Sequence, residues 1–574
     1  MKKIQLLLSY LILIFVGSLQ AQTVTWAGEL GSLGRDNISA MHTNNNGETV
    51  LAGVFSFAHD YDVINNQVDT ADYSVQTYVS KNDANGNLLW YKTIESGNVI
   101  PIFNVAQDVN GNVIITGRFF GTVDFNPSTS LVNNLANTNA NADMFVLKLD
   151  SNGDFVWAAH VVCNDDIDVT SMDIDASGNS YLFGNFKGVA NFDVDNSGQS
   201  SHSFTANSTS DDNFIVKLSS SGADVWAYPL GGNDQEQSGG LSLDKHGHLY
   251  LAGIFDGAFN SNPKSGGVHT LINNSGNSHG YIIKLDTQAN FIWSKKLGEL
   301  TSSIVLNEIE SDGIEHIFLS GGFDGTVDFD PSSTGVESLT NVNDNDHFVL
   351  CLDSASNFNW VRQISFNLQS ELNDLKAGNG AGVYLTGGFE NSLDLGTSYT
   401  SVDNKDLFVC RLSSTGGYVD WFYNTGSSLG TNDNYGKFID LDANNNIYTA
   451  GFFNGEIDLE PGSASVTINT ANGGSNYVAK YDQSTFVSIA KVEHSEESFV
   501  IYPNPNNGDF IIDFQGSGEL QKIEIFDILG KLKFYKEIDT QGEINVSSAL
   551  TNGIYLVEIT GKQGTSSKLV SIIK

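Results

Sequence analysis

A fixed period in the sequence constrains the fold of this chain more than any other feature. A Gly-x-Phe motif recurs every 64 to 69 residues, and its phenylalanines are Phe55, Phe119, Phe186, Phe255, Phe323, Phe389 and Phe453. A second motif, an aromatic residue followed closely by an aliphatic and usually a basic residue, begins at Tyr78, Phe145, Phe214, Tyr281, Phe348, Phe408 and Tyr477. Such repetition indicates an architecture in which each unit buries its apolar face only against its neighbours.

Each repeat is predicted to form four short strands joined by tight turns. β-Branched and aromatic residues alternate through the motifs, and no segment keeps a 3.6-residue period. An Asp-x-x-Gly turn precedes the second strand, as at Asp108/Gly111, and another follows the third, as at Asp150/Gly153. Aspartate bonds the backbone of such a turn, and glycine accepts its positive φ. Four strands per unit is the content of one propeller blade, so we predict an all-β fold.

The tryptophans indicate how the ring closes. They are Trp26, Trp90, Trp157, Trp226, Trp293, Trp360 and Trp421, and each opens a fourth strand. The last unit has no tryptophan after Tyr477, whereas Trp26 precedes the first unit without strands of its own. We therefore predict that the strand of Trp26 completes the sheet built from residues 438–487. Closure of this kind removes exposed sheet edges, which can template aggregation.

These motifs resemble those of a known repeat family. Gly-Asn-x-Tyr-x-x-Gly at residues 178–184, Phe-Val-x-Lys-Leu-Asp at residues 145–150 and the closing tryptophan are similar to the bacterial SBBP-type β-propeller repeat, over residues 23–490. The seven repeats and the position of Trp26 predict a seven-bladed β-propeller at residues 22–490, closed by the N-terminal strand, and the resemblance implies the propeller fold. It implies little about mechanism, because propellers carry unrelated functions.

The pattern changes after residues 491–498, which we interpret as a linker. Residues 499–574 lack tryptophan and the repeat motifs, and their short alternating strands predict a small Ig-like β-sandwich. They resemble the type A sorting domain of the type IX secretion system of Bacteroidetes at Pro503, Asn504, Pro505, Gly508, Gly530, Lys531, Gly553, Tyr555 and Lys568. The resemblance implies recognition by the type IX secretion machinery, transit across the outer membrane and removal of the tail. The rest of the chain is then secreted or held at the outer-membrane surface.

The amino terminus has the layout of a secretory signal peptide at residues 1–21. Two lysines precede an apolar run over residues 4–16, and small residues follow. We predict cleavage between Ala21 and Gln22, which would take the protein through the periplasm. No later segment reaches the ~20 apolar residues that a transmembrane helix requires, so we predict none in the mature chain.

Composition excludes some partners. The chain has 28 basic and 67 acidic side chains and a formal net charge of −39. A field of this sign repels nucleic acid, so we expect no nucleic-acid partner. The three cysteines cannot all pair, and Cys351 and Cys410 differ by one position in the repeat register. We interpret Cys163, Cys351 and Cys410 as buried free thiols.

Paired carboxylates recur on the face that carries the long loops. One stands five residues past the Gly-x-Phe aromatic residue, and the other stands two residues before the third-strand aromatic residue. The pairs are Asp124 with Asp143, Asp328 with Asp346, and Asp394 with Asp406. The second and third strands should be antiparallel neighbours, and carboxylate oxygens are ligands that Ca²⁺ takes. The alternative is that these side chains cap backbone groups where strands end.

The sequence shows no convergent catalytic set, and departures from the repeat are the remaining clues to function. Acids and histidines depart from the register at Asp60, His269 and His279, and aromatic residues do so on the long loops at Tyr61, Tyr73 and Tyr399. Long loops on a rigid scaffold are where binding usually occurs. The first hypothesis is an exported or cell-surface binding scaffold for an extracellular glycan or protein, with no cofactor apart from any calcium at the paired carboxylates. The alternative is an exported hydrolase or lyase, acting on a glycan or peptide at the long-loop face or in the central channel.

Overall fold

The computed structural model describes residues 23–31, 36–56, 58–65, 67–70, 75–96, 98–128, 130–137, 139–194, 202–206, 210–264, 268–274, 276–298, 302–343, 346–380, 382–402, 404–426, 434–461, 464–483, 499–502, 509–514, 520–527, 532–537, 543–547, 550, 553–561 and 564–572. Every regular element in these ranges is a β-strand, as the sequence predicts. No helix in the same ranges has the length and hydropathy needed to cross a membrane. The chain forms two compact units, Met1–Phe486 and Val487–Lys574. The predicted linker lies outside the described ranges.

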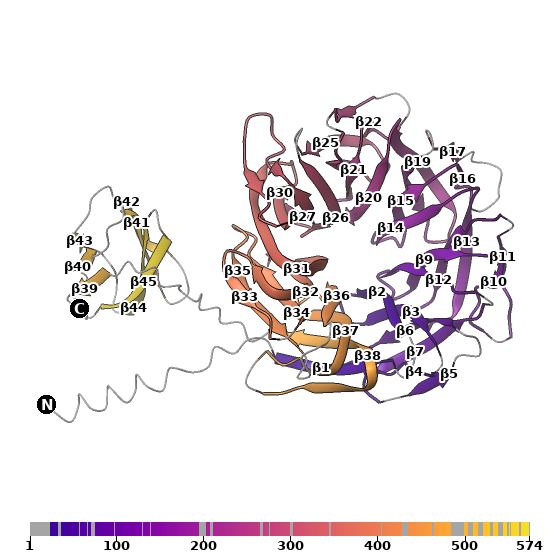
Figure 1. The fold of residues 1–574 in the computed structure, drawn as a ribbon, viewed down its shortest axis with the longest axis horizontal. Helices are drawn as coiled ribbons and strands as arrows, with labels where there is room; N and C mark the ends of the chain where they lie inside the picture. The colour runs from indigo at the N-terminus through magenta and orange to yellow at the C-terminus, as the bar shows by residue number, and fades with distance from the viewer. Residues whose placement is uncertain are drawn as a thin grey trace. The chain divides into compact units, whose positions relative to one another are not determined.

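The larger unit is built from four-stranded antiparallel sheets that succeed one another along the chain (Figure 1). In the first four repeats the strands, from the inner to the outer edge, are β2 (Asn37–Thr43), β3 (Thr49–Phe55), β6 (Gln76–Asn82) and β7 (Leu88–Ile94); β8 (Ile102–Gln107), β9 (Val113–Phe119), β12 (Asp143–Leu149) and β13 (Phe155–Cys163); β14 (Ile167–Ile174), β15 (Ser180–Phe186), β18 (Asp212–Leu218) and β19 (Asp224–Gly232); and β20 (Glu236–Leu243), β21 (His248–Phe255), β24 (His279–Asp286) and β25 (Phe291–Leu297).

The fifth and sixth repeats share one long strand, and the seventh has its own sheet. Their strands are β26 (Ser303–Ser311), β27 (His316–Asp324), β30 (Asp346–Asp353) and β31 (Phe358–Gly378); β31 again with β32 (Gly382–Asp394), β34 (Asp406–Leu412) and β35 (Val419–Thr425); and β36 (Tyr435–Leu441), β37 (Ile447–Asp458), β38 (Thr467–Asp482) and β1 (Thr23–Leu30). The first half of β31 pairs with β30 and its second half pairs with β32, so it passes from the outer edge of one sheet to the inner edge of the next.

The innermost strands surround a common centre (Figure 1). β2 contacts β8, and the contacts continue through β14, β20, β26, β31 and β36, which in turn contacts β2. The arrangement is propeller-like. In the sheet of β36, β37 and β38, β1 is the outer strand, with Trp26 opposite Lys480 and Ala27 opposite Ala479. This is the strand pairing predicted from the positions of the tryptophans.

The glycine of the Gly-x-Phe motif has a structural cause. Each inner strand contains a β-bulge opposite this glycine, as between Val169 and Ser171 in β14. A Cβ atom on Gly184 would lie 2.0 Å from the carbonyl oxygen of Asp168, so no larger residue fits. Approaches of 1.8 to 2.3 Å to a carbonyl oxygen in the inner strand, or directly before it in the case of Gly117, recur at Gly53, Gly117, Gly253, Gly321, Gly387 and Gly451. The aromatic residue two positions later is buried in the core of every repeat.

The long connections between the second and third strands contain short strands that the sequence did not predict. These are β4 (Ala58–Asp60) with β5 (Val68–Thr70), β10 (Thr122–Asp124) with β11 (Asn134–Ala136), β16 (Val189–Asn191) with β17 (Ser203–Thr205), β22 (Ala258–Asn260) with β23 (Thr270–Ile272), β28 (Thr326–Asp328) with β29 (Ser338–Thr340), and β33 (Ser398–Thr400) against β32. Alternate residues anchor them: Val123 and Phe125 are buried, and the ring of Phe125 lies 4.7 Å from that of Phe145, centroid to centroid.

Neighbouring sheets are joined at their outer edges by tryptophan and lysine. Trp157 donates its Nε1–H to the carbonyl oxygen of Ser220 at 3.2 Å, and Lys148 Nζ donates to the same oxygen at 3.3 Å. The junction between the last and first repeats has the same contacts. Trp26 Nε1 and Lys480 Nζ donate to the carbonyl oxygen of Ala84 at 3.1 and 3.0 Å.

The smaller unit consists of two sheets around one apolar core. One sheet has the order β39 (Phe499–Tyr502), β40 (Asp509–Phe514) and β43 (Glu543–Ser547); the other has the order β42 (Leu532–Glu537), β41 (Leu520–Asp527), β44 (Gly553–Gly561) and β45 (Gly564–Ile572). Ile512 from the first sheet and Ile525, Val557 and Val570 from the second are fully buried together. Two antiparallel sheets that share one core form a β-sandwich, in agreement with the sequence.

Candidate functional site

The aspartates that follow the Gly-x-Phe motif cap the short hairpins. Asp124 Oδ1 accepts the backbone N–H groups of Asn126 at 3.0 Å and Asn133 at 2.8 Å. Asp328 Oδ1 accepts in the same way from the residues at positions 330 and 337, at 3.1 and 2.7 Å, and Asp394 Oδ1 accepts the N–H of Gly396 at 2.7 Å. These contacts are of the kind expected from the capping interpretation.

Their predicted partners begin the third strands and bond elsewhere. Asp143 Oδ1 accepts the N–H of Cys163 at 3.1 Å, while Asp346 Oδ2 and Asp406 Oδ2 accept from the loop residues at positions 342 and 402, at 2.7 and 2.8 Å. Burial raises the pKa of Asp143 above its ordinary value. Across the described ranges, no group of three or more His, Cys, Asp or Glu residues is arranged to hold a metal ion. Calcium binding at the pairs stays a prediction.

Other candidates from the sequence are packed or lie outside the described residues. Tyr61 stacks on Tyr91 and Tyr399 stacks on Phe422, with ring centroids 4.1 and 3.7 Å apart, so both are held against the scaffold. Tyr73 lies outside the described ranges. The three thiols are buried and free, as predicted: Cys163, Cys351 and Cys410.

The export signals fall largely outside the described residues. These undescribed positions are Ala21, Gln22, Pro503, Asn504, Pro505, Gly508, Gly530 and Lys531. Gly553 and Tyr555 belong to β44, and Lys568 belongs to β45. Tyr555 is buried opposite Val570, so it contributes to the core of the sandwich.

The departures in the fourth repeat do not form one site. His269 Nδ1 lies 3.1 Å from Ser294 Oγ and 3.3 Å from Ser261 Oγ, and its ring packs on Phe291. His279 is buried at the first position of β24. Asp60 lies in the first repeat, on β4. The three residues therefore have separate surroundings.

A buried acid pair was missed by the sequence reasoning. Glu236 and Asp212 are 0% and 2% exposed. Burial, and then the neighbouring charge of Asp212, raise the pKa of Glu236 to about 9, so its carboxyl group is protonated at neutral pH. Asp212 also lines a cavity of about 470 Å³ with Tyr228 and Lys264. The signal was present in the sequence, because Glu236 begins the inner strand where the preceding repeat has Ile167.

The centre of the larger unit holds a polar cavity of about 230 Å³. Inner strands β2, β8, β14, β26, β31 and β36 line it. Its ionisable side chains include Lys376, whose Nζ lies 2.9 Å from Glu310 Oε1 and 3.8 Å from Asp440 Oδ1. Glu308 and Asp374 complete the acidic part of the wall. The strand β20 has Gly239 and Gly240 in its bulge and contributes no side chain there.

Burial controls the protonation of this central cluster. It raises the pKa of Asp374 to about 7 and that of Glu310 to about 6, and it holds the pKa of Glu308 well above the usual range. Burial alone would lower the pKa of Lys376, but Glu310 and Asp440 outweigh it and keep the ammonium charged. Carboxyl groups that titrate near neutral pH can exchange protons with a bound molecule.

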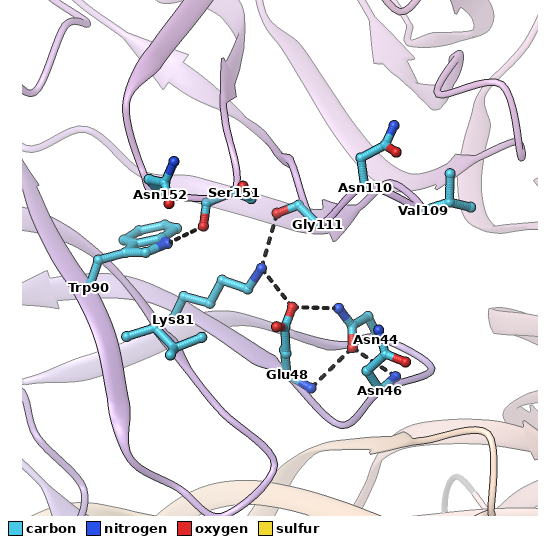
Figure 2. A pocket seen from close by; sticks show the side chains of 11 residues that line it. Asn44, Asn46, Glu48, Lys81, Trp90, Val109, Asn110, Gly111, Ser151 and Asn152 are labelled. Carbon is cyan, nitrogen blue, oxygen red and sulfur yellow. Dashed lines mark hydrogen bonds and ion pairs between the residues drawn. The ribbon is translucent and has the colours of Figure 1, made fainter.

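A larger cavity, of about 510 Å³, lies among the Asp-x-x-Gly type turns of the first two repeats, away from the long-loop face. Figure 2 shows its wall: Lys81 extends from β6 toward Glu48 and the carbonyl of Gly111, and the indole of Trp90 contacts Ser151. Lys81 Nζ lies 2.8 Å from Glu48 Oε2 and donates to the carbonyl oxygen of Gly111 at 3.0 Å. Trp90 Nε1 donates to the carbonyl oxygen of Ser151 at 3.0 Å.

The first two repeats differ in the turn position of the acidic residue that forms an ion pair with the lysine of the third strand. In the second repeat Lys148 Nζ bonds Asp108 Oδ2 at 3.0 Å, and Asp108 opens the turn. In the first repeat Asn44 opens the turn, and the acid stands four residues later at Glu48. The exchange is visible in the sequence, but the cavity between the two repeats is not, because its wall comes from turns that lie far apart along the chain.

Comparisons with known proteins bear on both units. Over 267 residues the chain is 25% identical to an uncharacterized WD repeat-containing protein of Acanthamoeba polyphaga mimivirus, and the aligned segment covers 42% of this chain and 19% of that protein. A quinohemoprotein alcohol dehydrogenase from Comamonas testosteroni has a TM-score of 0.38 and 11% identity, over 85% of this chain and 79% of that one. A fungal alcohol oxidase has a TM-score of 0.31 and 12% identity, over 97% and 98%. Similarities this low assign no function.

The smaller unit has a specific match. Residues 500–574 match the family model described as a secretion system C-terminal sorting domain. The match begins one residue after the predicted start at residue 499. The carboxy-terminal unit is thus a type IX secretion sorting domain, which indicates export of the chain to the cell surface or outer membrane.

Proposed function

We propose that this protein is an exported binding scaffold for an extracellular glycan or protein. The observation that carries the proposal is the use of its repeated carboxylates. Asp124 and Asp328 accept backbone N–H groups at hairpin ends, and Asp108 does the same in a turn. Acids used in this way hold a framework in place. A rigid framework with cavities between its repeats suits recognition.

The framework is proposed to be a closed, seven-bladed β-propeller of SBBP-type repeats. Side chains of the inner strands support closure, because several accept backbone N–H groups of the next repeat. Asp173 Oδ2 accepts the N–H of Leu243 at 2.8 Å, and Asp440 Oδ2 accepts the N–H of Thr43 at 2.5 Å. The second bond joins the last repeat to the first. A ring without free sheet edges resists aggregation outside the cell.

The sorting domain supplies the route in this proposal. A signal peptide is removed after Ala21, and the chain crosses the periplasm. The type IX machinery recognises the tail, the tail is removed, and the propeller is secreted or held at the surface. The net charge of −39 keeps nucleic acid out of the set of partners.

The route is tested by comparing the full-length chain with a variant that lacks residues 500–574, both expressed in a bacterium with a type IX system. We expect the full-length chain to yield a propeller in the medium or on the cell surface, and the variant to stay in the periplasm. Equal export of both would contradict the route.

The binding proposal is tested by probing glycan and protein arrays with the purified full-length chain, and absence of any ligand above background would contradict it.

A second candidate is an exported hydrolase or lyase acting on a glycan or peptide. The central cavity favours it, because Asp374 has a pKa of about 7 and can act as a general acid or base near neutral pH. Turnover of chromogenic glycosides or peptides by the full-length chain, lost in Asp374→Asn while the thermal transition is retained, would establish this candidate. Absence of turnover would contradict this candidate.

A further inference from the structure

The cavity on the turn side of the first two repeats points to a ligand class. It is walled by parts of five elements: the turn after β2, the strands β6 and β7, the turn after β8 and the turn after β12. Hydrogen bonds between the segments set its walls, including the one from Lys81 to Gly111 and the one from Trp90 to Ser151. A volume of about 510 Å³ is within the range of sites that hold small molecules.

The charges of the cavity cancel. Lys81 is almost fully buried and forms an ion pair with Glu48 at 2.8 Å. Burial alone would raise the pKa of Glu48, but hydrogen bonds from Lys81 and Asn44 outweigh it and hold the pKa below its ordinary value. The carboxylate is therefore ionised and matched by one ammonium group. The other residues that line the cavity are uncharged.

The rim offers uncharged hydrogen-bonding groups. Asn46, Asn110 and Asn152 are exposed on three different turns. Each uses its backbone N–H within its own turn, bonding the side-chain oxygen of the residue two positions earlier at 2.8 to 3.0 Å. The amide side chains of these three residues make no hydrogen bond to the described part of the chain. They can both donate to and accept from a ligand.

The same cavity also offers apolar contact area. The indole of Trp90 is partly exposed at its wall, and Leu89 and Val109 are 50% and 71% exposed. Aromatic and aliphatic side chains beside free amides match a molecule with an apolar face and hydroxyl edges. A sugar ring has both. Anionic sugars are disfavoured, because the chain carries −39 and the one lysine here is already paired.

We propose that the cavity between the first two repeats binds a small neutral saccharide, with the ring against Trp90 and the hydroxyl groups bonded by Asn46, Asn110 and Asn152. This inference depends on the proposed binding function and gives it a site and a ligand class. It places the site on the turn side of the propeller, whereas the sequence favoured the long loops.

The test uses two exposed positions that are equivalent in neighbouring repeats. Val109 and Ala176 each follow the aspartate that opens a turn, but only Val109 lines the cavity. Full-length wild type, Val109→Arg and Ala176→Arg are titrated with immobilised neutral mono- and disaccharides and with their uronic-acid and sulfated counterparts. Both variants add one positive charge at an exposed site, so folding and net charge are matched.

We expect wild type to prefer neutral saccharides, Val109→Arg to lose at least about tenfold in affinity because the arginine fills the cavity, and Ala176→Arg to bind as wild type does.

A second pair tests the amides: Asn152→Ala should weaken binding several-fold, while Asn85→Ala, at the same turn position in the first repeat, should not. Retention of binding in Val109→Arg overturns the site but leaves the binding scaffold intact. A preference for charged saccharides, or for protein ligands only, overturns the ligand class. Failure to bind any array component overturns both the inference and the proposed function.

Discussion

At the scale of single residues, the role of a carboxylate in this chain is decided by what its oxygens accept. Asp124 accepts two backbone N–H groups and ends a hairpin. Glu48 forms an ion pair with Lys81 and so balances the positive charge in the cavity between the first two repeats. Glu236 is buried against Asp212 and keeps its proton at neutral pH. The same chemical group thus serves as a cap, a counter-ion and a neutral acid.

The substitution Glu236→Gln should stabilise the protein, and more so at higher pH. The folded-state pKa of Glu236, about 9, lies above its ordinary value of 4.5, so the folded state holds a proton that the unfolded state releases between these values. Stability is therefore lost as pH rises through this window. Glutamine removes the titration and can still donate to Asp212. We expect a gain of at least about 1 kcal/mol at pH 8 and little at pH 5, measured by urea unfolding. The exposed Glu337→Gln is the control, and a gain independent of pH would contradict the assignment.

A calcium titration tests the paired carboxylates. Because Asp124, Asp328 and Asp394 already accept backbone N–H groups, we expect the Tm of the full-length chain to be equal in millimolar calcium and in chelator. A ligand that binds only the folded state raises Tm with concentration. A dose-dependent rise that magnesium does not reproduce would therefore establish calcium sites, and Asp124→Asn should then reduce it.

At the scale of elements, a turn of one repeat packs against the tryptophan of the preceding repeat. The turn after β18 presents Gly222, with φ +89°, to the indole of Trp157. A Cβ atom on this glycine would lie 2.7 Å from the ring, so the turn and the tryptophan must fit without a side chain between them. Trp157 also bonds the carbonyl of Ser220 in that turn. At this seam glycine is favoured for two reasons, conformation and space, whereas Ala289 and Ser356 take the equivalent turn position, also with positive φ, at two other seams.

A matched pair of glycine substitutions separates these reasons. Gly121 has φ +69°, and a Cβ atom added to it would meet no described atom within 4 Å, so Gly121→Ala should cost about 1 kcal/mol for backbone strain alone. Gly222→Ala adds the clash with Trp157, and we expect a further loss of roughly 1–3 kcal/mol. Urea unfolding midpoints measure both. Equal losses would show that the seam tolerates the extra methyl group.

At the scale of the whole molecule, the two ends of the repeat array meet in one sheet. β1 adds to β38, and the Trp26 and Lys480 contacts to Ala84 reproduce those of an internal seam. On the inner strands, Asp440 Oδ2 accepts the backbone N–H of Thr43, as Asp173 Oδ2 accepts that of Leu243 at an internal junction. Residues far apart in the sequence are thus joined by the same bonds that join adjacent repeats.

A disulfide across this junction tests closure. Ala27 and Ala479 are opposite each other in β1 and β38, where antiparallel partners have Cα atoms about 4.5–5.5 Å apart. This spacing accommodates a disulfide. We expect Ala27→Cys/Ala479→Cys to cross-link on oxidation and to raise Tm, with the increase lost on reduction. The single variant Ala27→Cys controls for the substitution. Failure to cross-link without prior denaturation would contradict a closed ring.

Much of the fold could be predicted from the sequence because the information was local. Gly184 and Phe186 mark a strand and its buried face, and Asp108 with Gly111 marks a turn, since each pattern acts over a few residues. The hairpins in the long connections were missed, because Val123 and Phe125 form only a short alternation among polar residues. The acid pair of Glu236 and Asp212 was missed for another reason: 24 residues and a strand separate them.

The candidate sites depended most on tertiary structure. The sequence alone determined a repeated all-β array, the pairing of its first strand with its last sheet and a carboxy-terminal sorting domain, because motifs at a fixed period carry that information. Only the tertiary structure decided that Asn46, Trp90 and Asn152 share one cavity and that Glu308 and Asp374 share another. Side chains from different repeats meet through the packing of whole sheets. No pattern within a single repeat encodes the distance between those side chains.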